Sequence, residues 1–256
     1  MKIGNWILKI HVHTFALLCF IFVSISLAPE AQAAAPTNGL VGYWAFDEGS
    51  GTTAGDSSGN GNNGTLVNGP TWTAGKVGSQ AISFDGSNDY IAVSNSTSLQ
   101  VAGSGNSFAV SLWMNGPAAQ SNTPFLIGTE ASISIQRGWA LMSNATNRRL
   151  TFFVHDGTTG YATGGAAGTE FNANAWTHVV LIVDRSTSLA EIWINGTRRD
   201  ADSISGAGSF EKNAGVWVGV SEANTARAYT GSLDEVRIYN RALSAAETNQ
   251  LYLMGK

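Results

Sequence analysis

The chain has 256 residues, of which 43% are hydrophobic and only 12% are charged, and its formal net charge is −4. The charged share is about half of the roughly 25% that is usual in soluble proteins. Glycine, serine, threonine and asparagine fill many of the polar positions instead. An acidic chain without a cluster of lysine or arginine lacks the basic face that nucleic-acid phosphates require. The composition therefore excludes a nucleic-acid partner and favours a turn-rich all-β protein.

The N-terminal segment, residues 1–33, is predicted to be a secretory signal peptide. Two lysines precede an apolar run at residues 15–27, and Ala31-Gln32-Ala33 follows as a small-x-small cleavage site. The run is shorter than the roughly 20 residues that a membrane-spanning helix needs, so we expect no membrane span. Leu18 precedes Cys19, where a lipoprotein cleavage site takes a small residue, so plain secretion is favoured over lipid attachment.

The rest of the chain, residues 34–256, is predicted to form one secreted, extracellular domain. It carries 12 basic and 17 acidic residues and no cysteine. Disulfides and thiolate chemistry are therefore excluded, and the stability of the domain must come from its core or from a bound metal. A chain of this length can bury a single sizeable core.

Short segments rich in β-branched and aromatic residues follow one another along the domain, each bounded by Gly, Asn, Asp or Ser. Alternation of period two is clear where Phe108, Val110 and Leu112 alternate with Ala109 and Ser111. The expected strands lie at residues 39–46, 81–86, 89–94, 107–115, 149–156, 176–184, 189–196, 215–220 and 232–240.

Helical signals occur only near the C-terminus. Ser244 and Glu247 have the spacing of a capping box, which predicts a short helix through Leu251. Many short strands followed by one helix predict an all-β fold, an antiparallel β-sandwich or jelly roll with a short C-terminal helix.

Residues 55–64, GDSSGNGNNG, match three functional patterns at once: a nucleophile elbow, a dinucleotide-binding loop and the start of a calcium loop. The first two need a helix after the turn, and the following TLVNGPTW is not helical, so both are rejected. Asp56, Ser58, Asn60 and Gly61 would supply half of a calcium loop. The position for the last carboxylate is Val67, so another part of the fold would have to complete the site. The alternative is a turn in which Asp56 caps its own backbone.

Asp85 and Asp89, in FDGSNDY, are predicted to form the tight turn of a hairpin between two strands. Asp85 is an additional candidate metal ligand.

Seven motifs in this order resemble the laminin-G-like domains of the concanavalin A-like lectin/glucanase superfamily, over Leu40 to Tyr252. The motifs are YWAFDEGSG, DSSGNGNNGT, GKVGSQAISFDGSNDYIAV, FAVSLWM, WTHVVLIVD, IWINGT and GSLDEVRIYNRALSAAE. The resemblance implies a jelly roll of two antiparallel sheets. It also implies a structural calcium ion (Ca²⁺), for which Glu48 and Asp234 would join Asp56 and Asn60.

Catalytic residues are not evident. The glucanase relatives carry their carboxylates as E-x-D on one strand, a pattern that this chain lacks. The adjacent pairs Asp47-Glu48 and Asp234-Glu235 would point to opposite faces of a strand. His155 with Tyr161 is the only candidate pair for a lyase, and only its proximity in sequence supports it. We therefore expect a protein that is not an enzyme.

Most tryptophans are explained by packing. Trp44, Trp113 and Trp176 lie in framework strands and are predicted to be buried. Trp193 and Trp217 alternate with branched residues, so both are predicted to lie on the outer surface of a sheet.

Aromatic residues in or beside loops are the candidates for a binding site, because aromatic rings stack on sugars and rim loops often carry binding residues. The predicted ligand-binding residues are Trp139, Tyr161, Tyr229 and Arg137. Two functions remain open. One is a secreted, non-catalytic, carbohydrate-binding (lectin-like) module, and the other is an extracellular adhesion or structural module that binds a protein partner.

Overall fold

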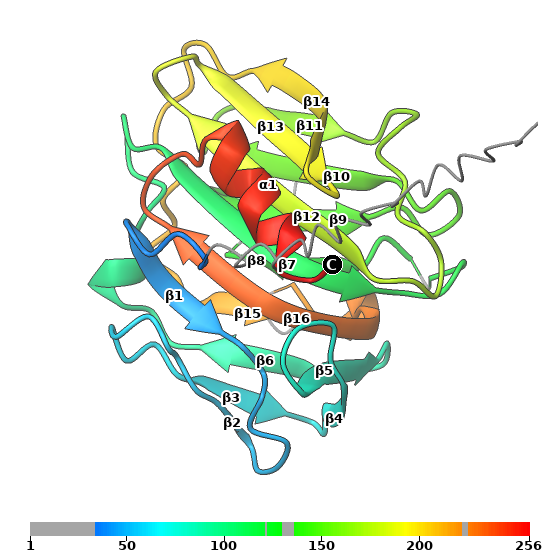
Figure 1. The fold of residues 1–256 in the computed structure, drawn as a ribbon. Coiled ribbons are helices and arrows are strands. Elements are labelled where there is room, and N and C mark those ends of the chain that lie inside the picture. Colours follow the sequence, from blue (N-terminus) through cyan, green and yellow to red (C-terminus); the bar gives the residue numbers. More distant parts are fainter. Residues whose placement is uncertain (1–33, 121, 130–135, 222–224) are drawn as a thin grey trace, which may run out of the picture. The chain divides into compact units, whose positions relative to one another are not determined.

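Two antiparallel sheets face each other in the computed structural model, which describes residues 34–120, 122–129, 136–221 and 225–256 (Figure 1). Residues 32–256 form one compact unit. The predicted signal peptide lies outside the described residues. The mainly β composition and the sandwich confirm the predicted fold class.

Sheet A has the strand order β14-β13-β12-β7-β16-β5-β4, and β1 pairs with the C-terminal half of β16. Its strands are β1 (Leu40–Trp44), β4 (Thr71–Ala74), β5 (Gln80–Asp85), β7 (Phe108–Asn115), β12 (Thr177–Asp184), β13 (Leu189–Ile194), β14 (Thr197–Ser203) and β16 (Thr230–Tyr239).

Sheet B has the strand order β11-β10-β9-β8-β15-β6-β3-β2. Its strands are β2 (Thr53–Ala54), β3 (Gly64–Val67), β6 (Tyr90–Val93), β8 (Phe125–Gly128), β9 (Gly138–Ser143), β10 (Leu150–His155), β11 (Gly160–Gly164) and β15 (Val216–Val218). Two 3-10 turns, η1 (Thr97–Leu99) and η2 (Thr225–Arg227), and the helix α1 (Ala245–Leu253) complete the described elements.

The core lies between the sheets and follows the period-two pattern. Phe108, Val110 and Leu112 of β7 are fully buried in it, whereas Ala109 belongs to a second apolar cluster on the other face of sheet A. Because one face of β7 packs in the core and the other in the second apolar cluster, nearly the whole strand is buried. The alternation read from the sequence is therefore confirmed.

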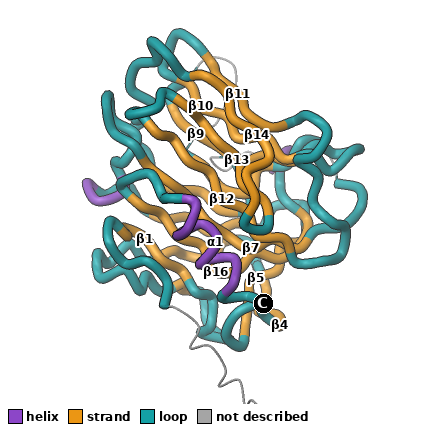
Figure 2. The backbone as a smooth tube through the Cα atoms, turned by 45° about the horizontal axis from the view of Figure 1, so that its top comes forward, coloured by secondary structure: helices purple, strands orange, loops and turns teal. Residues whose placement is uncertain are grey.

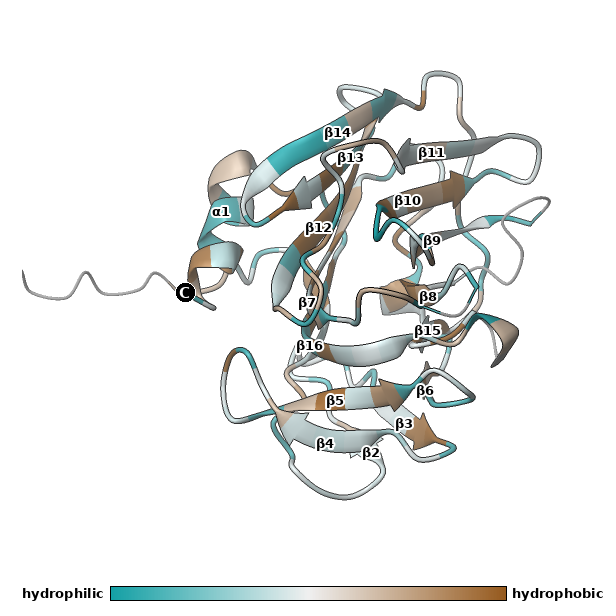
Figure 3. Cartoon of the chain, turned by 90° about the vertical axis from the view of Figure 1, so that its right-hand side faces the viewer, coloured by the Kyte–Doolittle hydropathy of each residue, from teal (hydrophilic) through white to brown (hydrophobic). Residues whose placement is uncertain are grey.

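The helix α1 begins at the predicted capping box, because Ser244 Oγ accepts from the Glu247 backbone N–H and the Glu247 side chain accepts from the Ser244 N–H. Leu251 of this helix is buried in the second apolar cluster, which also contains Val180 and Ile182 of β12. The helix therefore lies on the outer face of sheet A, as Figures 2 and 3 show. No helix in the described part of the chain is long and apolar enough to cross a membrane.

The turn between β5 and β6 corrects one prediction. Asp85 Oδ1 accepts from Ser87 N–H, and Asp89 Oδ2 accepts from Asp85 N–H, so the tight turn is present. The two strands that it joins do not pair, because β5 belongs to sheet A and β6 to sheet B. The predicted hairpin is therefore wrong, and the turn is a crossing from one sheet to the other.

The tryptophans predicted to be buried differ in their surroundings. Trp44 is buried in the core as predicted. Trp113 is also buried, but it lies on the outer face of sheet A, where its ring stacks on that of Tyr252. Trp176 is only half-buried, so that part of the prediction is wrong.

Candidate functional site

The loop at residues 55–64 is organised around the Asp56 carboxylate. Its Oδ1 accepts from the Tyr43 and Ser58 N–H groups at 2.9 and 2.8 Å. Its Oδ2 accepts from Ser58 Oγ and the Asn62 N–H at 2.8 and 2.9 Å. These bonds hold the pKa of Asp56 below its usual value against the opposing effect of burial. The loop thus forms the alternative structure, a turn in which the aspartate caps its own backbone.

Of the other predicted calcium ligands, Glu48 and Asn60 contact this loop, whereas Asp234 does not. Glu48 Oε1 accepts from Gly55 N–H at 2.7 Å, and Asn60 Nδ2 donates to the Val41 carbonyl. Asp234 contacts a different segment. No group of three or more His, Cys, Asp or Glu side chains within the described ranges could hold a metal ion. The four residues therefore do not fit a single calcium site.

Asp234 lies at a β-bulge in β16 and is fully buried. Its Oδ2 accepts from the Lys76 and Val77 N–H groups at 2.7 and 3.0 Å. Its Oδ1 has no hydrogen-bond partner, and burial raises the pKa of the carboxyl to about 7. The neighbouring Glu235 is also buried and pairs with Arg237 at 2.5 Å. The bulge thus overrides the expectation that these adjacent carboxylates point to opposite faces.

Two of the predicted ligand-binding residues are core residues. Trp139 lies in β9 with 1% of its surface exposed, and its ring packs against that of Phe108. Tyr229 is fully buried, and its hydroxyl has no hydrogen-bond partner. Neither ring can stack on a ligand from outside, so the prediction that both serve a binding site is wrong. Tyr229 lies in the loop before β16, but its ring is buried in the core.

Arg137 and Tyr161 are accessible to different degrees and are not brought together on one face. Arg137 is exposed, and its Nε donates to the Asp156 carbonyl at 2.8 Å. Tyr161 is half-buried and packs against the core, where its ring meets that of Phe210 edge-on. Their role in binding stays a prediction.

The histidines of the described chain do not form a catalytic pair. His155 Nδ1 accepts from Gly157 N–H, and its ring lies beside Phe153 on the outer face of sheet B. Tyr161 faces the core from the next strand, so the suggested lyase pair is not formed. His178 is fully buried next to Ser111 Oγ, and burial lowers its pKa to about 3.

The outer face of sheet B carries a continuous row of cross-strand neighbours. Trp217 of β15 points away from the core because Val216 and Val218 are both buried in it. Trp217 is the register partner of Ala92 on one side and Gly128 on the other, and these pairings continue across all eight strands. The row is Thr53, Thr65, Ala92, Trp217, Gly128, Ala140, Phe153 and Ala162.

Two aromatic residues are separated by two small residues in this row. Gly128 and Ala140 lie between Trp217 and Phe153, which are both half-buried. Tyr90 adds a second ring on the Trp217 side, with 5.5 Å between the ring centroids. Accessible rings thus flank a central strip of small side chains, an arrangement suited to stacking on a flat ligand. We define the aromatic row as Tyr90, Trp217 and Phe153.

A cavity of about 350 Å³ is lined by Asn122, Thr123, Ala226 and Arg227. The Arg227 guanidinium lies over the Phe125 ring, 5.4 Å from its centroid. Phe125 belongs to the apolar cluster that includes Ala140 and Phe153. Arg227 of the cavity lining therefore contacts the same apolar cluster against which Phe153 of the aromatic row packs.

Sequence reasoning found part of this site. The alternation around Trp217 predicted its outward orientation, which is confirmed. The same signal was available for Phe153, because only one of two adjacent phenylalanines can face the core of a strand. Tyr90 and Arg227 carried no local signal, since their positions depend on contacts between distant segments.

Comparison with known proteins agrees with this architecture. Residues 85–249 match the protein family Laminin_G_3, described as "Concanavalin A-like lectin/glucanases superfamily". A search of curated proteins gave no match.

Solved structures with a similar fold include the binding domains of two toxins and a domain in complex with a sugar. One is the binding domain of Paraclostridial Mosquitocidal Protein 1, with a TM-score of 0.68, 20% identity, and coverage of 84% of this chain and 52% of that one. Another is domain 4 of AbnA, a GH43 extracellular arabinanase from Geobacillus stearothermophilus, in complex with arabinotriose. Its TM-score is 0.64 and its identity 21%, over 83% of this chain and 98% of that one.

The botulinum neurotoxin serotype D binding domain has a TM-score of 0.65 and 16% identity, over 85% of this chain and 51% of that one. This chain thus spans about half the length of the two toxin domains. At these identities the structures show a shared fold. Because the family match covers well over half of the chain, the protein belongs to the concanavalin A-like lectin/glucanase superfamily.

Proposed function

We propose that the protein is a secreted, non-catalytic carbohydrate-binding module that uses the outer face of sheet B. The observation that carries this proposal is the aromatic row, in which Trp217 and Phe153 flank the small residues Gly128 and Ala140. Half-buried rings offer an apolar surface for the C–H faces of a sugar, and their edges are already fixed by packing. The complex of AbnA domain 4 with arabinotriose gives a precedent for sugar binding on this fold.

The chemistry of this face supports binding without catalysis. Glycosidases normally place two carboxyl groups across the scissile bond. Among the described strand residues that face outward from sheet B, none is Asp or Glu. Asp156 follows β10, but its oxygens accept from Thr158, Thr159 and Gly208 and hold the local turn.

A glycan array with two matched variants tests the proposal. Trp217→Thr removes the central ring of the aromatic row, and threonine keeps a good strand propensity. Trp193→Thr is the control, because Trp193 is also half-buried in mid-strand but lies on the outer face of sheet A. We expect wild type and Trp193→Thr to bind the same glycans and Trp217→Thr to lose them.

Binding of a protein partner is the competing function. The receptor-binding domain of botulinum neurotoxin D has a similar fold, and exposed aromatic rings also occur in protein interfaces. If wild type binds no glycan on the array and captures a protein partner only when Trp217 is present, the second function replaces the first.

Calcium binding is proposed separately and has a direct test. The buried Asp234 Oδ1 without a partner is the group that would gain most from a cation. Melting is recorded with excess chelator and with added calcium, and a stabilising ion must raise the midpoint. An unchanged midpoint would contradict the calcium prediction and leave the sugar-binding proposal intact.

Secretion is tested by N-terminal sequencing of the exported protein. The predicted cleavage site gives a mature chain that begins at Ala34.

A further inference from the structure

The cavity beside Phe125 contains a cation, Arg227, that has no acidic partner among the described residues. Four of the eight other described arginines form ion pairs with glutamates: Arg149, Arg198, Arg237 and Arg241. Arg227 makes neither an ion pair nor a hydrogen bond with any described residue, and its guanidinium is held by the ring of Phe125. In a chain with a net negative charge, this unpaired arginine is a local positive site.

The position of Arg227 suits an anion. The guanidinium is planar by delocalisation, and its parallel N–H donors match the two oxygens of a carboxylate. Stacking on Phe125 also restricts the orientation of the side chain before a ligand arrives, which lowers the entropic cost of binding.

The walls of the cavity supply further polar groups. Asn122 Nδ2 donates to the Ala226 carbonyl at 2.7 Å, which ties the two lining segments together. Asn122 and Thr123 both line the cavity, and the amide oxygen and hydroxyl that they carry can bind the hydroxyls of a sugar. A volume of about 350 Å³ lies within the range of ligand pockets, roughly 300–1,000 Å³.

From this arrangement we infer that the protein prefers acidic glycans and that Arg227 binds the carboxylate of a uronic or sialic acid residue while neighbouring sugars stack on the aromatic row. The inference rests on the proposed function and names its ligand class. A neutral glycan could occupy the aromatic row but would leave the Arg227 guanidinium without a counter-charge.

The test compares each acidic glycan with its own carboxyl-reduced form. Oligogalacturonate, hyaluronan oligosaccharides and sialyllactose are titrated calorimetrically before and after reduction of the carboxyl groups, so that charge is the main difference within each pair. We expect wild type to bind at least one acidic form about tenfold or more tightly than its reduced form. The preference should weaken at high salt.

Two charge-matched variants locate the effect. Arg227→Met removes the cation and keeps an unbranched side chain, and it should abolish the preference while leaving binding of the reduced glycan unchanged. Arg199→Met removes one exposed positive charge from β14 of sheet A and should leave the preference intact.

The possible outcomes separate this inference from the proposed function. Equal binding of acidic and reduced glycans overturns the inference alone. A preference that survives in Arg227→Met overturns the assignment to this cavity. Failure of wild type to bind either form overturns both proposals. Loss of both forms in Trp217→Thr, with loss of the preference alone in Arg227→Met, supports both.

Discussion

The outer faces of the two sheets have the same alternating strands but different surroundings. On sheet A, the outward residues Val180 and Ile182 are buried beneath α1. On sheet B, the outward residues Trp217 and Phe153 remain half-buried, and the described helix α1 lies on the opposite sheet. The strand pattern thus determines which side chains leave the core. Elements distant in sequence determine whether those side chains are buried by a covering element or form an accessible surface.

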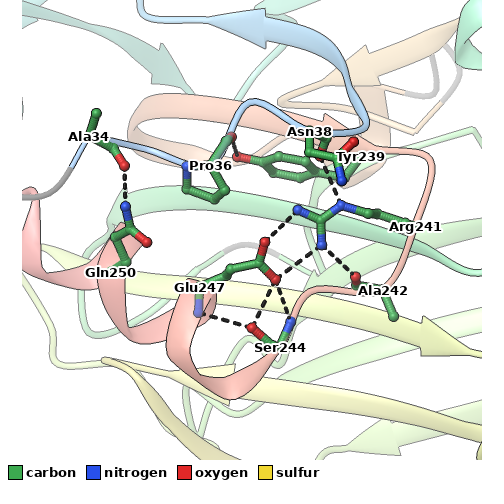
Figure 4. Close-up of polar contacts among 9 residues, drawn as sticks. All are labelled: Ala34, Pro36, Asn38, Tyr239, Arg241, Ala242, Ser244, Glu247 and Gln250. Atoms are coloured by element: carbon green, nitrogen blue, oxygen red, sulfur yellow. Dashed lines mark hydrogen bonds and ion pairs between the residues drawn. The ribbon is translucent and has the colours of Figure 1, made fainter.

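Sheet A is covered by contacts between the two ends of the described chain (Figure 4). Arg241 donates to the Asn38 carbonyl and pairs with Glu247, while Tyr239 donates to the Pro36 carbonyl. The Gln250 side chain also donates to the Ala34 carbonyl. These bonds place residues 34–38 and the start of α1 together over sheet A.

Weakening the packing of α1 on the outer face of sheet A should have the largest effect on stability. Leu251→Ala removes a buried side chain between α1 and β12, and a buried leucine truncation typically costs about 3 kcal/mol. Leu253→Ala on the same helix is the control, because Leu253 is 44% exposed and should change stability by less than about 0.5 kcal/mol. Urea unfolding measures both variants. Equal stabilities would mean that α1 does not cover sheet A in solution.

A smaller effect is expected from the ion pair that fastens α1. Hydrogen bonds from Arg241 lower the pKa of Glu247 from 4.5 to about 2. The charged carboxylate therefore stabilises the fold above pH 4.5, and this stabilisation is lost as the pH falls from about 4.5 to about 2.

Glu247→Gln should remove about 1 kcal/mol at pH 7, an amount limited by solvent screening of a partly exposed pair. Its unfolding free energy should fall less steeply than that of wild type between pH 4.5 and 2. Parallel pH profiles would show that this pair contributes nothing to holding the helix.

The smallest effect on stability is expected on sheet B. Trp217→Thr loses the ring contact with Tyr90 and should cost less than about 1 kcal/mol, since the site is half-buried and threonine favours strands. A loss comparable to that of Leu251→Ala would show that Trp217 serves packing, as the residues under α1 do. Thermal and urea unfolding of the two variants side by side decide the point.

Local sequence patterns predicted nine of the sixteen described strands, the capping box and the outward orientation of Trp217, because each depends on neighbours along the chain. Trp139 was placed in a loop because glycine and serine surround it, yet β9 forms through pairing with β8 and β10. Tyr229 does lie in a loop, but its ring is buried in the core beside that of Phe84. The β5–β6 crossing was mistaken for a hairpin because both use the same turn residues. What the local sequence lacked for Trp139 and for this crossing was the identity of the pairing strand.

The central claim is that sheet B binds sugar and that the equivalent face of sheet A does not. The most direct measurement follows the indole N–H signals of Trp217 and Trp193 by NMR while an array-positive glycan is added. We expect the Trp217 signal to shift in a saturable manner and the Trp193 signal to stay in place. A shift of Trp193 without one of Trp217 would contradict the account.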